Sequence, residues 1–184
     1  MYTYTVRQDD YADNPREFYD HFGTLMMWTR HGSNGDKAAK NYSPSSYSGW
    51  DEFQEALEKD FDGVLLPVYM YSHGGSTIST QPFGCPWDSG QVGFIGVSKE
   101  DILTSYNRKR MTKALRERAT AALEAEVKEY AAYMEGDVWQ VAVHKVGEEP
   151  EDFTCSYYGR EHAEAEGRAE ATYMNSREVA NGQK

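Results

Sequence analysis

Three residues of one predicted loop have side chains suited to nucleophilic or acid–base chemistry. Cys85 supplies a thiol, His73 an imidazole that can act as a base, and Asp88 a carboxylate that can orient that base. Catalysis by this set requires the thiol and the imidazole to lie within hydrogen-bond reach. Cys85 follows Gly84 and has no predicted helix N-terminus beside it to activate its thiol, and most free cysteines act as small buried hydrophobic residues. We therefore do not expect an enzyme.

The same loop has a purely structural interpretation that competes with any ligand role. Asp88 or Ser89 can accept a hydrogen bond from the backbone of its own turn, Gly90 allows a positive φ, and Trp87 can pack on a sheet. The functional alternative keeps this turn and adds a ligand or partner. That partner would be held by His73, Cys85, Trp87 and Asp88.

A basic segment interrupts an acidic chain of 184 residues whose net charge is -11. Residues 99–118 carry +4, whereas residues 1–98 carry -7 and residues 119–184 carry -8. Its cations fit either a solvated helix face or a contact with phosphates or an acidic partner. They are Arg108, Lys109, Arg110, Lys113, Arg116 and Arg118.

The last third of the chain is strongly acidic. Glu161 and Glu164 lead a series that, together with residues 148–152, can imitate a run of phosphates and occupy the basic channel of a nucleic-acid-binding enzyme. The alternative is a solvated surface that keeps the protein soluble.

The sequence predicts neither a metal nor a cofactor. The five histidines have no pair spaced three or four residues apart, and Cys85 is far from Cys155, so no set of ligands has the spacing of a metal motif. The glycine-containing segment 32–37 lacks the spacing of a phosphate-binding loop.

The apolar patterns predict one α+β domain over residues 1–184, with a mainly antiparallel sheet and helices packed on one face. Residues 31–47 and 73–90 are expected to be loops, and residues 176–184 a frayed tail. Helices are expected to begin at Ser48, Ser98 and Thr112, with a last one over 160–175. The helix from Thr112 is expected to carry one apolar face, formed by Leu115, Ala119, Leu123, Val127, Tyr130 and Met134. Expected strands cover 2–7, 24–29, 64–71, 91–97, 138–145 and 153–158, and Pro67 places part of the third at a sheet edge or bulge.

The chain is expected to be cytoplasmic. It has no charged start followed by an apolar core, no apolar run approaches membrane-spanning length, and two cysteines do not make a disulfide framework. These features predict no membrane partner, and they leave the oligomeric state open.

One block of sequence carries a family resemblance. It runs from Cys85 through Pro86-Trp87-Asp88-Ser89-Gly90-Gln91-Val92-Gly93-Phe94 to Ile95, and it is accompanied by Asn14-Pro15-Arg16-Glu17 and Phe22-Gly23-Thr24-Leu25. With these marks the chain resembles a widespread family of small proteins from phages, plasmids and other bacterial mobile elements. Accessory proteins of such elements often counter host defence, and a few look like inhibitors of CRISPR effector nucleases. The resemblance therefore implies a counter-defence role in a bacterial host cell.

Three hypotheses follow. The first is a non-enzymatic inhibitor that binds a host CRISPR effector nuclease or its nucleic-acid complex, with the basic segment touching nucleic acid, including a weak duplex DNA contact, or an acidic surface. The second is a small-ligand module, such as a sponge for a nucleotide signal, with the 73–90 loop as its pocket. The third is an enzyme that depends on Cys85.

Overall fold

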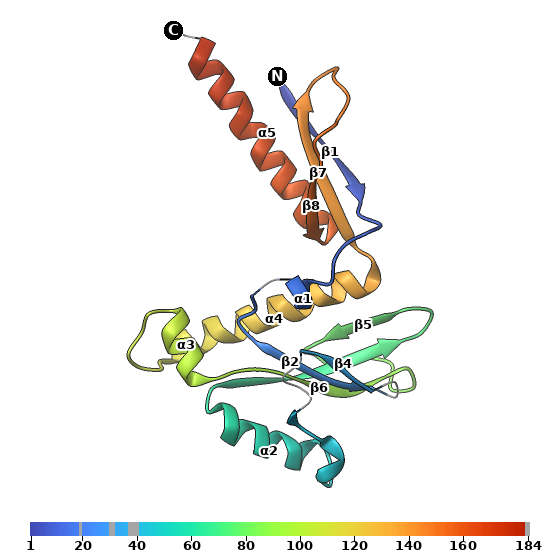
Figure 1. The fold of residues 1–184 in the computed structure, drawn as a ribbon, viewed down its shortest axis with the longest axis vertical. Coiled ribbons are helices and arrows are strands. Elements are labelled where there is room, and N and C mark those ends of the chain that lie inside the picture. Colours follow the sequence, from blue (N-terminus) through green and yellow to red (C-terminus); the bar gives the residue numbers. More distant parts are fainter. Residues whose placement is uncertain (19, 30–31, 37–40, 183–184) are drawn as a thin grey trace. The chain divides into compact units, whose positions relative to one another are not determined.

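The computed structural model describes residues 1–18, 20–29, 32–36 and 41–182, and these residues adopt the predicted α+β fold with two antiparallel sheets (Figure 1). The sequence predicted a single domain. By its internal contacts the chain divides into two compact units. The terminal unit combines residues 1–14 with residues 132–184, and the central unit is the continuous segment 15–131.

The terminal unit is a three-stranded sheet covered by one helix. Strands β1 (Tyr2–Gln8), β7 (Val138–Lys145) and β8 (Thr154–Tyr158) lie in the order β1-β7-β8, and α5 (Arg160–Gly182) packs on them. The helix approaches closely because Gly167 meets the sheet: a Cβ there would stand 2.6 Å from the Tyr4 ring. Residues 176–182, predicted to fray, continue this helix, and the small residues Ala163 and Ala171 are its buried contacts.

The central unit is a five-stranded sheet in the order β3-β2-β6-β4-β5, with every pair antiparallel. Its strands are β2 (Thr24–Thr29), β3 (Gly32–Gly35), β4 (Val64–Ser72), β5 (Ser76–Ser79) and β6 (Ser89–Val97). Its helices are α1 (Pro15–Phe18), α2 (Trp50–Phe61), α3 (Lys99–Ser105) and most of α4 (Lys113–Glu135), and a short 3-10 helix spans Pro44–Ser46.

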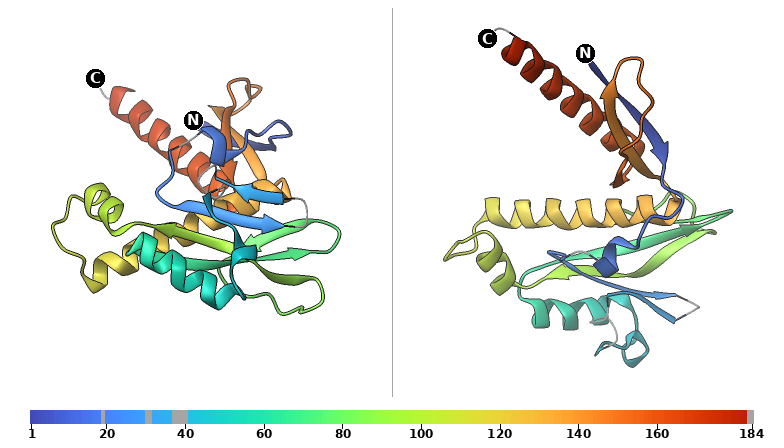
Figure 2. Two further views of the ribbon diagram at one scale, coloured as in Figure 1. Left: turned by 60° about the horizontal axis from the view of Figure 1, so that its bottom comes forward. Right: turned by 45° about the horizontal axis from the view of Figure 1, so that its top comes forward.

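Helices cover both faces of this larger sheet, whereas the sequence predicted helices on one face (Figure 2). On one side, Phe53 and Leu57 of α2 pack with Met26 and Phe94 in a core edged by aromatic rings. On the other side lies α4. Its predicted apolar face is buried, and a Cβ on Gly23 would clash with Leu123 at 2.3 Å. The sheet is therefore a middle layer between α2 and α4.

Two of the predicted helix starts are confirmed and one needs correction. The Ser98 side chain caps α3 by accepting a hydrogen bond from the backbone of Asp101, and Thr112 bonds Leu115 at the start of α4. Ser48 is not the cap of α2. The helix begins after Gly49, and Glu52 accepts hydrogen bonds from both the backbone and the hydroxyl of Ser48. Those bonds lower the pKa of Glu52.

The two predicted loops contain short strands. β3 lies within the 31–47 segment, and β5 within the 73–90 segment. β3 reads Gly-Ser-Asn-Gly and β5 reads Ser-Thr-Ile-Ser, so neither has an apolar alternation. They are strands because a neighbouring strand pairs with their backbone. His31 falls outside the described residues.

Candidate functional site

The structure brings together three of the residues predicted in the 73–90 segment. His73 follows β4 and Asp88 precedes β6, and the two positions are held together by a 2.9 Å backbone hydrogen bond from Ser72 to Asp88. His73 Nδ1 lies 3.4 Å from Asp88 Oδ2, and the thiol of Cys85 donates to the same oxygen at 3.5 Å. The turn is further held by Ser89, whose hydroxyl donates to the carbonyl of Cys85.

This geometry does not form a nucleophile–base pair. The carboxylate of Asp88 stands between the thiol of Cys85 and the imidazole of His73, so the base contacts the acid rather than the nucleophile. His73 is 73% exposed, so solvent screens its interaction with Asp88.

The exposure of Trp87 differs from what the structural interpretation of this loop predicted. The sequence placed its ring on the sheet, but the side chain is 92% exposed. An indole exposed to this degree buries almost no surface and so adds little to the stability of the fold. Tryptophan is enriched at binding surfaces. Trp87 therefore remains a candidate contact residue next to the Asp88 cluster.

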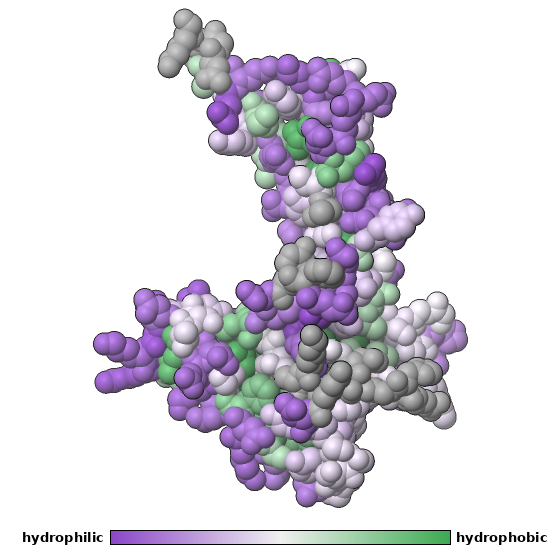
Figure 3. Space-filling view, viewed as in Figure 1, coloured by the Kyte–Doolittle hydropathy of each residue, from purple (hydrophilic) through white to green (hydrophobic). Residues whose placement is uncertain are grey.

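The basic segment lies at one end of the central unit, where the chain passes from α3 to α4. Arg108, Lys109 and Arg110 form the connection, all three are exposed, and none makes an ion pair with any described residue. We call these three residues the basic corner. In Figure 3 this end of the unit is a hydrophilic projection.

The other three cations of the segment have partners on the fold. Arg118 lies over the Tyr106 ring at 4.6 Å, and Lys113 is 3.9 Å from Glu117. Arg116 points toward β4, where its Nη1 donates to the carbonyl of Gly63 at 2.6 Å. The six cations predicted as one patch therefore divide into an unpaired corner and three residues with local contacts.

The predicted acidic residues belong to the terminal unit. Glu161 and Glu164 lie in the first turns of α5, where Glu164 pairs with Arg160 at 2.9 Å. This unit holds fourteen acidic and six basic residues, against sixteen and thirteen in the larger central unit. Most of the excess negative charge therefore resides on the terminal unit.

A buried charge network in the central unit was not predicted. The Arg16 side chain is 3% exposed, and its guanidinium donates to Asp36, to Glu126 at 2.9 Å and to the carbonyl of Gly23 at 2.7 Å. Burial lowers the pKa of Arg16, but hydrogen bonds and charge from Asp36 and Glu126 outweigh it, so the pKa stands above its usual value. Glu126 also accepts from the backbone of Phe22. The network fixes α1, β2 and α4 together, which is a structural task.

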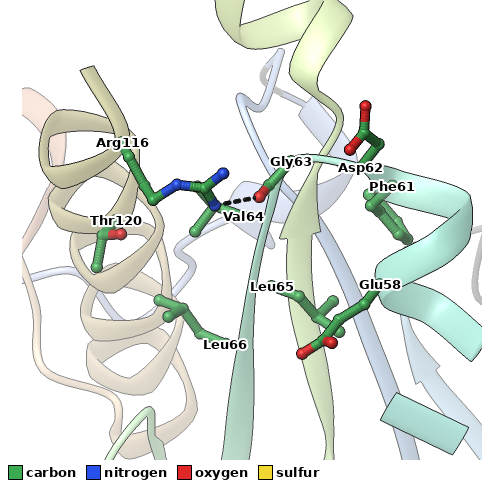
Figure 4. A pocket seen from close by; sticks show the side chains of 9 residues that line it. All are labelled: Glu58, Phe61, Asp62, Gly63, Val64, Leu65, Leu66, Arg116 and Thr120. Carbon is green, nitrogen blue, oxygen red and sulfur yellow. Dashed lines mark hydrogen bonds between the residues drawn. The ribbon is translucent and has the colours of Figure 1, made fainter. Parts of the chain in front are cut away.

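A second unpredicted feature is a hollow of about 460 Å³ beside β4 (Figure 4). Its walls come from α2 and α4, with Glu58 and Phe61 on one side and Arg116 and Thr120 on the other. Nothing in the local sequence signals it, because it arises where two helices and a strand meet.

Within the described part of the chain, no group of His, Cys, Asp and Glu side chains is arranged to hold a metal ion, and no buried side-chain nitrogen or oxygen lacks a partner. Cys85 carries a free thiol, and the side chain of Cys155 lies outside the described residues. Among the described helices, none combines the length and the apolar character needed to span a bilayer. Comparisons with protein-family models, with curated proteins and with solved structures found no match to this chain.

Proposed function

We propose that the protein is a non-enzymatic binding protein whose basic corner contacts a phosphate-bearing or acidic surface of its partner. The observation that carries this proposal is that Arg108, Lys109 and Arg110 are consecutive, exposed and without ion pairs among the described residues. In a chain of net charge -11, such cations could be neutralised locally, and they are not. Unpaired arginines and lysines offer the donors that recognise phosphate oxygens.

The specific partner that we propose is a host CRISPR effector nuclease or its complex with nucleic acid, in a counter-defence role. The resemblance of the central sequence block to mobile-element proteins supports this choice. The charge distribution adds a physical reason, since a nuclease offers nucleic acid to a basic corner and a basic channel to an acidic unit. Glu161 and Glu164 would then contribute to the second contact.

A cleavage assay tests the proposal. Purified CRISPR effector nucleases of several types are assayed on a DNA target with and without the protein, and a gel shift on duplex DNA is run in parallel. We expect dose-dependent loss of cleavage by at least one effector. The triple variant Arg108→Glu, Lys109→Glu, Arg110→Glu should reduce inhibition at least tenfold.

A control variant separates local contact from net charge. Reversal of Lys59, Lys128 and Lys145, all exposed and spread over both units, changes the net charge equally and should leave inhibition intact. Equal loss in both triple variants would mean that overall charge acts, rather than the corner. If the protein inhibits none of the effectors, the assignment of a nuclease as its partner is wrong. If it binds no polyanion, the proposed role of the basic corner is wrong.

One observation favours a second candidate, a ligand-binding module on the 73–90 segment. Trp87 is exposed and directly precedes Asp88, which contacts His73, and its ring can stack on a nucleobase or another flat group. A nucleotide that binds the folded state raises the thermal unfolding temperature, and Trp87→Ala should remove that shift. Loss of function in a normally folded Cys85→Ala variant would instead favour the third hypothesis, a cysteine-dependent enzyme.

A further inference from the structure

Half of strand β4 forms a free edge of the central sheet. Residues Val64–Val68 pair with residues 93–97 of β6 on one side, and β5 pairs only with residues 69–72 of β4 on the other. The segment from Val64 to Val68 therefore has no second strand neighbour among the described residues. Its free side presents backbone hydrogen-bonding groups that can pair with another strand.

Two helices make this free edge the floor of a slot. Figure 4 shows Arg116 and Thr120 of α4 on one side of β4, and Glu58 and Phe61 of α2 on the other. The hollow between them measures about 460 Å³, within the range of roughly 300–1,000 Å³ that ligand pockets occupy. Because the sheet is the middle layer between these helices, a strand added at the edge would continue that layer and lie between α2 and α4.

The slot has a polar signal on its α4 side. Arg116 donates one hydrogen bond to the carbonyl of Gly63, the residue just before β4, at 2.6 Å. A guanidinium carries five N–H donors, so further donors remain to meet a carboxylate. On the α2 side the slot offers Glu58 and the ring of Phe61, which suit an apolar or basic side chain.

We propose that an extended segment of a partner protein binds as an added strand along Val64–Val68. Successive side chains of a strand point to opposite faces, so the segment would direct an acidic side chain toward Arg116 and apolar side chains toward Phe61. The unpaired backbone of the edge identifies the occupant as a polypeptide, and Arg116 favours one with an acidic side chain at that position. The free edge needs backbone amides in register, which a nucleic acid lacks, and Glu58 would repel phosphates.

Pro67 limits how this strand can bind. It has no backbone N–H, so this residue cannot donate a backbone hydrogen bond to a neighbouring strand. A register shift between Val68 and Tyr69 ends the regular part of the edge. Pro67 and the register shift both disfavour pairing with strands of arbitrary sequence. A bound strand therefore needs side-chain contacts with Arg116 and Phe61 as well as backbone hydrogen bonds. This site is separate from the basic corner and does not depend on the nuclease assignment.

Defined peptides test the proposal. The probes are fluorescein-labelled heptapeptides that alternate valine with threonine and carry Glu, Thr or Lys at the central position. Binding is followed by fluorescence anisotropy, and amide hydrogen exchange is measured over residues 63–68. We expect the Glu peptide to bind most tightly, at least tenfold better than the Lys peptide, and to slow exchange in this segment.

Variants of the peptide and of the protein separate the two parts of the contact. N-methylation at alternate peptide residues should abolish binding when it blocks the edge that pairs with β4 and should be tolerated on the opposite edge. Arg116→Glu should reverse the preference from the Glu to the Lys peptide. Arg118→Glu, an exposed change on the same helix, should leave it unchanged.

The outcomes are decisive. Peptide binding with equal tolerance of both N-methylation patterns would overturn strand addition, and so would failure of every peptide to slow exchange over residues 63–68. Sedimentation of the protein alone gives a further check. A concentration-dependent dimer that protects the same segment would overturn the foreign partner and assign the slot to a second copy of the chain.

Discussion

Arginine serves two opposite tasks within the central unit. Arg16 is almost completely buried and is held by Asp36 and Glu126, whereas Arg108 and Arg110 are exposed and have no ion pair among the described residues. Removing a buried cation leaves its carboxylates buried without a partner, which is destabilising. Removing an exposed cation costs little, because water takes its place. Their surroundings therefore separate arginines that stabilise the fold from those available to a partner.

The largest effect is expected from Arg16→Met, which keeps the length of the side chain but removes its charge. Asp36 and Glu126, which are 19% and 17% exposed, would lose their cation, so we expect the free energy of unfolding to fall by about 3 kcal/mol. Chemical denaturation measures this. Arg16→Lys restores the charge without the planar guanidinium and should recover part of the lost stability. If Arg16→Met were as stable as the wild type, the buried network would not stabilise the fold.

Arg118 is an intermediate case, since it is exposed but has a partner. Its guanidinium lies 4.6 Å from the Tyr106 ring, and an exposed cation–π contact contributes about 0.5–1 kcal/mol. We expect Arg118→Ala to lower stability by that amount in thermal unfolding. Tyr106→Leu tests the contact from the other side, and the double variant should cost no more than the larger single change if the contact accounts for both.

The basic corner should barely influence stability. Single substitutions Arg108→Ala, Lys109→Ala and Arg110→Ala are each expected to change the free energy of unfolding by less than about 0.5 kcal/mol. The same substitutions should weaken binding to a polyanion and make that binding less sensitive to salt, because each phosphate contact releases counterions. Titration into duplex DNA at two salt concentrations measures this. If a variant of the basic corner were as destabilising as Arg16→Met, the corner would be part of what stabilises the fold.

The smallest effect concerns pH. Because the folded-state pKa of Arg16 is raised, its stabilisation is complete below its unfolded-state pKa and is lost only as the pH rises through the folded-state value, far into the alkaline range. The stability difference between wild type and Arg16→Met should therefore stay constant from pH 6 to pH 10. Urea denaturation at several pH values checks this, and a marked slope would mean that another group titrates in the network.

The contrast also explains what the sequence could predict. Local signals succeeded where the interacting residues are neighbours in the chain: the apolar face of α4, the Ser98 cap and the exposed basic segment. The Arg16 network was missed because its partners lie 20 and 110 residues away. For the same reason the slot beside β4 had no signal in any single segment.

The 73–90 segment lies between these cases. Its residue types offered His73, Cys85 and Asp88 as one possible set, beside a purely structural turn, and in the structure Asp88 Oδ2 lies near both of the other side chains. The order of the three groups depends on how β4 and β6 end, which composition does not encode. In that order Asp88 contacts both the thiol and the imidazole.

The division of the chain into a continuous central unit and a unit built from both terminal segments has a consequence for synthesis on the ribosome. The central unit is complete once residue 131 has emerged, so it can fold while the chain is still growing. β1 is made before the central unit but pairs with β7, which follows that unit, and the Thr5–His144 hydrogen bond joins residues 139 positions apart. β1 therefore waits for the whole central unit to be made before its partner strand exists, and until then its unpaired edge is exposed to chaperones and to other nascent chains.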